Sequence, residues 1–203
     1  MKRLTTKSTV SVMAGAIGLL LLSGCSTNDT AATVGKTNVS VNTVEKEVKS
    51  ILDERAKVNT SGMNLSTGVK LSQEVLRFHV ISILLADVGT KYKISPTAAE
   101  IAKQRAALVT QVGGEKALPS ALVNANIAPE DFDIYVKTTM ISAALGNLAT
   151  SAGVDNTNGA AVQSLVATTA KKEGVVINKR YGKWDSVNAN IVDASANSAV
   201  VTK

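Results

Sequence analysis

The chain has one histidine, His79, and one cysteine, Cys25, among its 203 residues. Zinc sites in proteins draw mainly on histidine and cysteine side chains, so this composition gives no credible set of metal ligands. One histidine would be enough for a Ser–His–Asp triad, but no Gly-x-Ser-x-Gly sequence marks a serine nucleophile. His79 falls inside a predicted helix, next to its apolar face. We therefore predict a histidine at the boundary of the core, and a chain with no catalytic residue, no metal and no cofactor.

Three carboxylates, Glu130, Asp131 and Asp133, cluster where a helix is predicted to begin. Paired carboxylates can act as general acid and base. A helix N-terminus also attracts acidic side chains, because the helix dipole places partial positive charge there. We predict this second, structural role for the three acids.

Aromatic and basic residues alternate in the segment Arg180-Tyr181-Gly182-Lys183-Trp184, which contains the only tryptophan of the chain. Such a segment can bind a sugar or a peptide. Alternatively, Tyr181 and Trp184 pin the C-terminal segment onto the helices by burying a large apolar area. We favour the packing interpretation.

The N-terminus combines basic residues with a short apolar segment. Lys2, Arg3 and Lys7 precede the apolar residues 10–22, a stretch too short for a comfortable membrane span, which needs about 20 apolar residues. It ends at Leu22-Ser23-Gly24-Cys25, which resembles the lipobox of bacterial lipoproteins. The resemblance implies cleavage before Cys25 and attachment of a diacylglyceryl lipid to its sulfur. The alternative is an ordinary signal peptide or membrane anchor with an incidental cysteine.

We expect a lipoprotein signal peptide over residues 1–24, a flexible tether over 25–32, a folded domain over 33–192 and a flexible tail over 193–203. Because two acyl chains hold a protein stably on a bilayer, this predicts an extracytoplasmic protein anchored to the cell membrane. Without its three basic residues in the leader, the chain keeps 19 of its 22 basic residues against 16 acidic ones. This near balance gives no support to a nucleic-acid partner.

The elements that would position these residues follow from local patterns. Residues 32–41 predict a β-hairpin whose turn is Gly35-Lys36-Thr37-Asn38. Gly35-Lys36-Thr37 is similar to the end of a phosphate-binding loop, but Thr30 stands where that motif needs its earlier glycine. Asn42, with Glu45 three residues later, predicts the capped start of a helix.

Helical periodicity dominates the rest of the chain. The first helix carries an apolar stripe of Val44, Val48, Ile51 and Leu52. Further helices are predicted near 72–92, 96–112, 115–125, 129–148 and 160–172, and short strands at 175–177 and 190–192. The longest of them should be the most buried, through Val75, Leu76, Val80, Ile83, Leu84 and Val88. The predicted fold class is mainly α (α+β), with a small β-hairpin and a short C-terminal strand.

This order of elements resembles the N-terminal chaperone domain of the SurA and PrsA group of extracytoplasmic folding factors. The matching features are the hairpin with its following helix, the segment 91–101 after the long apolar helix, and the segment 126–132 before the next one. The resemblance covers roughly residues 31–150. The segment 176–185 also resembles an Asn-Pro-Arg-Tyr-Gly-x-Trp-Asp sequence that closes some lipoproteins of this kind, although Lys179 replaces the proline.

SurA and PrsA carry parvulin prolyl-isomerase domains, whereas only residues 151–159 separate the last two predicted helices here. The resemblance therefore implies the chaperone part without the isomerase, which would bind unfolded or exported polypeptides. Methionine adapts to varied partners, so Met63 and Met140, together with Leu65, are the candidate peptide-binding residues. Two alternatives stay open, namely a prolyl isomerase with a degenerate site and a structural or assembly lipoprotein that binds one envelope partner.

Overall fold

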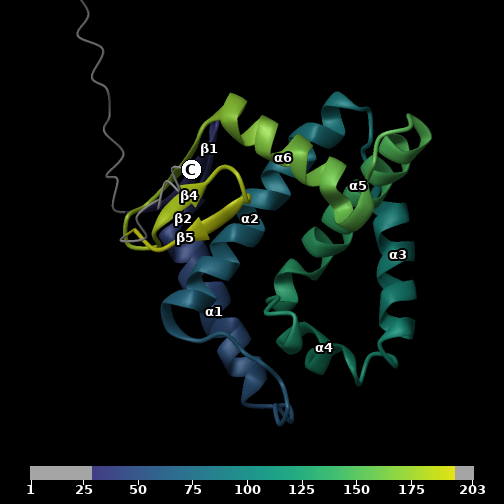
Figure 1. Ribbon diagram of the computed structural model, residues 1–203. Coiled ribbons are helices and arrows are strands. Elements are labelled where there is room, and N and C mark those ends of the chain that lie inside the picture. Colours follow the sequence, from purple (N-terminus) through teal and green to yellow (C-terminus); the bar gives the residue numbers. More distant parts are fainter. Residues whose placement is uncertain (1–28, 195–203) are drawn as a thin grey trace, which may run out of the picture.

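The computed structural model describes residues 29–194 (Figure 1). The predicted signal peptide, Cys25 and most of the predicted tail lie outside these residues. Within them the chain is mainly helical with small antiparallel sheets, as predicted. No helix between residues 29 and 194 has the length and apolarity needed to cross a membrane.

The first strand is the centre of a three-stranded sheet. β1 (Thr30–Val34) pairs antiparallel with β2 (Thr37–Ser40) on one side and with β3 (Val175–Ile177) on the other. The sheet therefore joins the first strands of the described chain to a strand that follows the last helix. Ala31 and Ala32 are buried in this strand. The predicted tether is therefore wrong over residues 30–32, because these small residues complete a sheet whose third strand comes from far along the chain.

The turn of the hairpin is also shorter than predicted. Val34 pairs directly with Thr37, so Gly35 and Lys36 alone make the turn, and Asn38 belongs to β2. Gly35 adopts a φ of +57°, which suits a residue without a Cβ.

The first helix follows β2 without a linker. α1 (Val41–Arg55) is capped by Ser40, whose Oγ accepts a hydrogen bond of 2.9 Å from the Thr43 N–H. The prediction of Asn42 as the cap is wrong by two residues, since the extended backbone of β2 already provides the cap geometry. Leu52, predicted on the buried stripe, is 46% exposed.

The second helix is the centre of the molecule. α2 (Gly68–Lys91) packs against α1, the sheet and the later helices, and all but one of its predicted core residues are buried. Ile83 is the exception and is half-buried. α2 anchors a first core, made with the sheet, α1 and α6.

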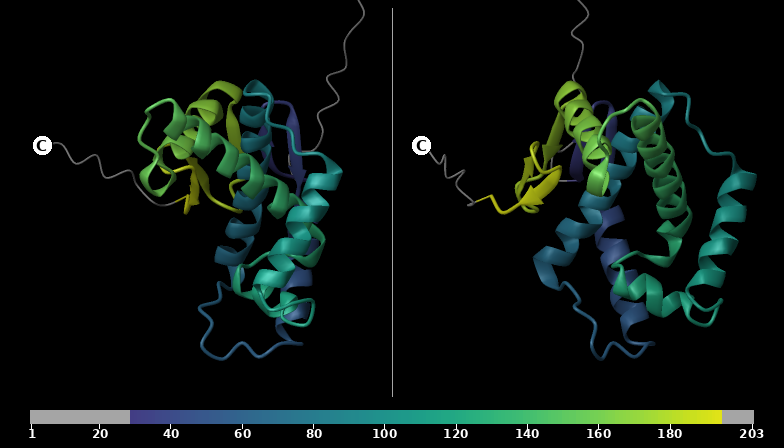
Figure 2. Two further views of the ribbon diagram at one scale, coloured as in Figure 1. Left: turned by 90° about the vertical axis from the view of Figure 1, so that its right-hand side faces the viewer. Right: turned by 45° about the vertical axis from the view of Figure 1, so that its right-hand side comes forward.

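The remaining helices follow α2 along the chain, and some of them build a second core beside the first. They are α3 (Ala98–Gln111), α4 (Leu118–Asn124), the short 3₁₀ helix η1 (Pro129–Asp131), α5 (Phe132–Ser151), the 3₁₀ turn η2 (Thr157–Gly159) and α6 (Ala160–Glu173). Figure 2 shows α3 beside α5, with α4 at one end of the pair. The second core joins Val109, Leu118, Leu122, Ile127, Phe132 and Val136.

The starts of α3 and α5 differ from the predictions. α3 begins at Ala98, two residues after the predicted start at position 96, and Thr97 caps it through a complete capping box with Glu100. Pro129 opens η1, and α5 itself begins at Phe132. The described part of the chain closes with a hairpin of β4 (Lys183–Asp185) and β5 (Asn190–Val192), of which only the second strand was predicted.

Candidate functional site

A concave apolar groove lies between α5 and α6. It encloses about 300 Å³. Three large side chains at the groove are well exposed, namely Tyr92 at 42%, Leu148 at 47% and Val154 at 52%. The lining residues are Tyr92, Leu145, Leu148, Ala149, Ala152, Val154, Ala161, Ser164 and Leu165, and none of these carries a charge.

The sequence of α5 explains why a groove forms here. Its buried stripe runs through Val136, Ile141 and Leu145, but the next residue of that stripe, Leu148, passes beyond the first core. Helical periodicity places Leu148 on the same inner side as these residues, but the structure leaves it 47% exposed. Small residues, Ala149 and Ala152, follow on the same side and leave the space that a larger side chain would fill.

The loop after α5 contributes Val154 to the groove and packs against both α5 and α6. Gly146 is buried, and a Cβ placed there would lie 2.6 Å from the Asn156 side-chain nitrogen and 4.0 Å from Val162. Asn156 in turn accepts a hydrogen bond from the Val162 N–H. This close approach holds the start of α6 against α5.

The three residues predicted to bind peptides do not line this groove. Met63 and Leu65 are half-buried in the segment between α1 and α2, and Met140 packs against the second core. The groove is instead lined by apolar residues at the ends of α2 and α5, such as Tyr92 and Leu148. Helical periodicity alone does not distinguish these exposed residues from core residues.

A larger hollow of about 540 Å³ has a mixed lining. Apolar side chains such as Phe78, Ile81 and Tyr135 alternate there with the amides Asn126 and Asn188. Amide groups can hydrogen-bond to peptide backbone in either sense, as donor or acceptor. This hollow is therefore a second, more polar concave surface.

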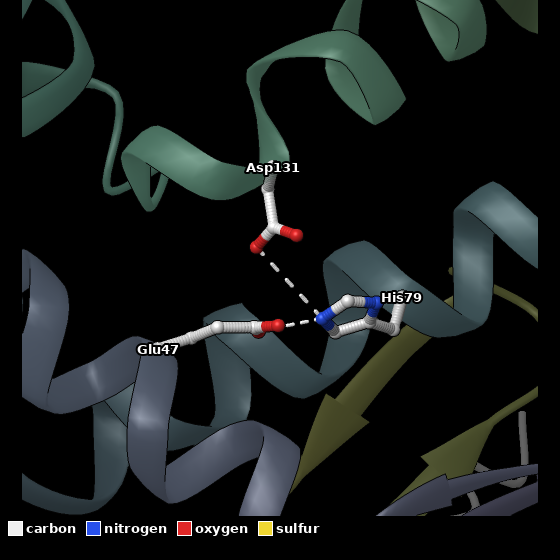
Figure 3. A group of neighbouring side chains, drawn as sticks. All are labelled: Glu47, His79 and Asp131. Atoms are coloured by element: carbon white, nitrogen blue, oxygen red, sulfur yellow. Dashed lines mark hydrogen bonds and ion pairs between the residues drawn. The ribbon is translucent and has the colours of Figure 1, made fainter.

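Away from both hollows, three ionisable side chains meet in the interior (Figure 3). Glu47 comes from α1, His79 from α2 and Asp131 from the end of η1. His79 Nε2 forms a hydrogen bond of 2.6 Å with Glu47 Oε2 and lies 3.9 Å from Asp131 Oδ2. Glu47 and Asp131 are each only 5% exposed. One atom from each of the three residues lies within 4.8 Å of the other two, so the group has the dimensions of a metal site.

Burial and mutual charge shift the protonation of this cluster. Burial opposes a charged imidazole, but the hydrogen bond with Glu47 and the negative charges of Glu47 and Asp131 outweigh it and raise the pKa of His79. Burial, together with the negative charge of Glu47, raises the pKa of Asp131 to about 7, against the opposing charge of His79. A proton is therefore retained among these groups near neutral pH.

The structure separates the three acids that were predicted to stabilise a helix start. Glu130 is exposed and accepts a hydrogen bond from Ser50, and Asp133 pairs with Arg105 at the surface. Asp131 instead points inward to His79. The position of His79 at the core boundary is confirmed, while Glu47 was not among the predicted site residues.

The C-terminal aromatic segment packs as predicted. Tyr181 is buried, and Trp184 contacts the first core. The Arg180 guanidinium lies 5.2 Å from the centre of the Tyr181 ring and pairs with Glu45 at 2.9 Å. These contacts fasten the segment to α1.

No protein-family model matches this chain, and neither the curated proteins nor the solved structures contain a match. The function must therefore follow from the residues of the chain itself.

Proposed function

We propose that this protein is an extracytoplasmic lipoprotein, anchored to the membrane through Cys25, that transiently binds unfolded or newly exported polypeptides without enzymatic activity. The observation that carries the proposal is the uncharged groove between α5 and α6, with Tyr92, Leu148 and Val154 exposed around it. An unfolded client exposes apolar side chains that it buries when folded. Such side chains lower the free energy by leaving water, and an apolar groove can bury them.

The size of the groove favours weak and reversible binding. About 300 Å³ is at the lower end of ligand pockets, which suits one or two client side chains. Burying one such side chain contributes about 1.5–3 kcal/mol, and a dissociation constant of about 1 mM corresponds to only about 4 kcal/mol. Release without an energy source is consistent with these magnitudes.

The sheet offers a second contact for an extended client. β2 is an edge strand in the order β2-β1-β3, and Thr37 and Asn38 on it are exposed. An extended peptide can pair with such an edge through main-chain hydrogen bonds. The groove would then select apolar side chains, and the edge would hold backbone of any sequence.

The test measures whether residues 26–203 suppress the aggregation of a reduced model protein. The same chain carrying Leu148→Gln is measured beside it. The matched control is Leu52→Gln, because Leu52 is 46% exposed and Leu148 47%, while Leu52 lies on α1 outside the groove. We expect Leu148→Gln to lose most of the holding activity and Leu52→Gln to keep it. No suppression by the unaltered protein at several-fold molar excess would refute the proposal.

Two further measurements address the alternatives. A photo-crosslinker at position 148 should capture many clients in cells, whereas one dominant partner would favour an assembly lipoprotein. A proline-peptide isomerisation assay should run at the background rate.

Mass spectrometry of the mature protein should find a lipid on Cys25, and an unmodified sulfur there would remove the membrane anchor from the proposal.

A further inference from the structure

The Glu47–His79–Asp131 cluster is short of positive charge. Both carboxylates are almost fully buried. Among the described residues, His79 is the only group whose positive charge acts on Asp131, while Glu47 and Glu130 both act against its ionisation. If both acids are ionised, even a charged imidazole leaves one negative charge uncompensated. Buried charge of this kind needs a cation or a proton.

The geometry favours a cation at a shared centre. One nitrogen, His79 Nε2, faces an oxygen of Glu47 at 2.6 Å and an oxygen of Asp131 at 3.9 Å (Figure 3). A proton on that nitrogen can bond to Glu47, but 3.9 Å is too long for a hydrogen bond to Asp131, whose side chain interacts with Glu47 instead. A metal ion between the three atoms would contact all of them at once.

From these contacts we infer that Glu47, His79 and Asp131 form a binding site for a first-row divalent transition-metal ion such as Zn²⁺. Zinc binds nitrogen and carboxylate oxygen at about 2.0–2.2 Å, which places ligand atoms about 3.4 Å apart in a tetrahedral site. The two separations from Nε2, 2.6 and 3.9 Å, lie on either side of that value. The third separation, between the two carboxylate oxygens, is at most 4.8 Å, so side-chain shifts on the order of 1 Å would accommodate the ion.

The mixed ligand set selects the class of metal. Mg²⁺ and Ca²⁺ prefer sites made of oxygen alone, whereas an imidazole with carboxylates suits zinc and its neighbours in the first transition row. A hollow of about 240 Å³ borders His79 and is also lined by Ser82, Lys137 and Thr138. It provides a route for the ion from solvent and room for the water that would complete its coordination.

The ligands are held in place by the packing of three separate elements. Glu47 lies one turn before the buried Ile51 on α1, and Asp131 directly precedes the buried Phe132. His79 meets the Phe78 ring edge-on, with ring centres 5.5 Å apart. Phe132 belongs to the second core and Ile51 to the first, so an ion here would join the two cores.

The experiment uses the full chain in a non-ionic detergent, without a polyhistidine tag and after removal of metal by a chelator. Calorimetric titration with Zn²⁺ at pH 7.5 should give one ion per chain. His79→Gln and the double variant Glu47→Gln/Asp131→Asn should weaken binding at least about 100-fold, since each removes a direct ligand. Glu130→Gln is the matched control, because Glu130 is an exposed carboxylate next to Asp131. It should bind as the unaltered chain does.

If a variant fails to fold, nuclear magnetic resonance of the unaltered protein still tests whether Zn²⁺ binds at His79. His79 is the only histidine of the chain, so its imidazole ¹⁵N signals need no assignment. Zn²⁺ at one equivalent should shift the Nε2 signal strongly and leave Nδ1 protonated. Unchanged imidazole signals at saturating Zn²⁺, no heat of binding, or equal affinity of the variants lacking ligands would each overturn the site, and the cluster would then hold only a shared proton.

Discussion

His79 Nε2 lies 2.6 Å from Glu47 Oε2, which ties α2 to α1 in the interior of the protein. Asp131 approaches the same nitrogen from the start of α5. This single contact point thus depends on three elements, and it sets how the stability of the protein responds to pH and to substitution.

Without metal, the protein should lose stability as the pH rises from about 4 to above 7. The pKa of Asp131 is raised to about 7 in the folded state, so between its unfolded value near 4 and that point the folded chain keeps a proton that the unfolded chain has released. The raised pKa of His79 acts in the same direction above pH 6.5, because its contribution is lost as pH rises through the folded value. Linkage then makes the free energy of unfolding fall with pH.

Urea denaturation in the presence of a chelator, at about pH 5 and pH 8, measures this effect. We expect a decrease on the order of 2–4 kcal/mol between the two conditions. Asp131→Asn should flatten the curve over the lower part of the range, since the amide does not titrate. A free energy that is equal at both pH values, or that rises, would contradict the raised pKa of Asp131.

Replacing His79 should cost more than replacing either acid. His79→Leu leaves Glu47 and Asp131 buried beside each other with no imidazole, and breaking a buried ion pair costs about 3–5 kcal/mol. Adding Asp131→Asn to His79→Leu should restore part of that loss, because it removes one of the uncompensated charges. Chemical denaturation of the two single variants and the double variant forms the cycle, and additive losses would show that the residues do not interact.

Gly89→Ala should destabilise the protein although alanine favours helices. A Cβ at Gly89 would lie 2.8 Å from the backbone oxygen of Ile94 and 3.1 Å from Ile141. Overpacking of this kind costs about 1–3 kcal/mol, which exceeds the gain of about 1 kcal/mol in helix propensity. Thermal unfolding compared with Thr90→Ala, an exposed neighbour on the same helix, checks the effect. An unchanged or higher melting temperature for Gly89→Ala would show that α2 and α5 separate easily.

The sequence predicts the helices better than it predicts their meeting points. The 3.6-residue period placed Val75, Val80, Leu84 and Val88 on the buried face of α2, where the structure has them. A glycine inside a helix is ordinarily expected to weaken it, whereas Gly89 is buried where the Ile94 backbone and Ile141 pack closely. The contact with Ile141 joins segments far apart in the chain, and local patterns do not encode it.

The buried cluster of Glu47, His79 and Asp131 was likewise predictable only in part. Glu47 lies three residues after Val44 and four before Ile51, so its place on the apolar stripe of α1 is visible in the sequence. That position was the available signal for a buried acid. Its pairing with His79 and Asp131, 32 and 84 positions further on, depends on how α1, α2 and α5 pack and has no local signature.

Filling the groove should abolish polypeptide binding and leave the fold intact. Ala152 is exposed at the end of α5 and lines the groove, so Ala152→Phe places an aromatic ring in the space that a client side chain would occupy. The backbone at this position, with φ −86° and ψ 5°, accepts any ordinary residue. Fluorescence anisotropy with a labelled unfolded peptide rich in leucine should show at least about tenfold weaker binding, the loss expected when about 1.4 kcal/mol of apolar contact is removed. Ala102→Phe, at an exposed position on α3, is the control and should bind the peptide normally. Equal peptide affinity of the two variants would mean that clients do not use the groove, because only one of these rings occupies it.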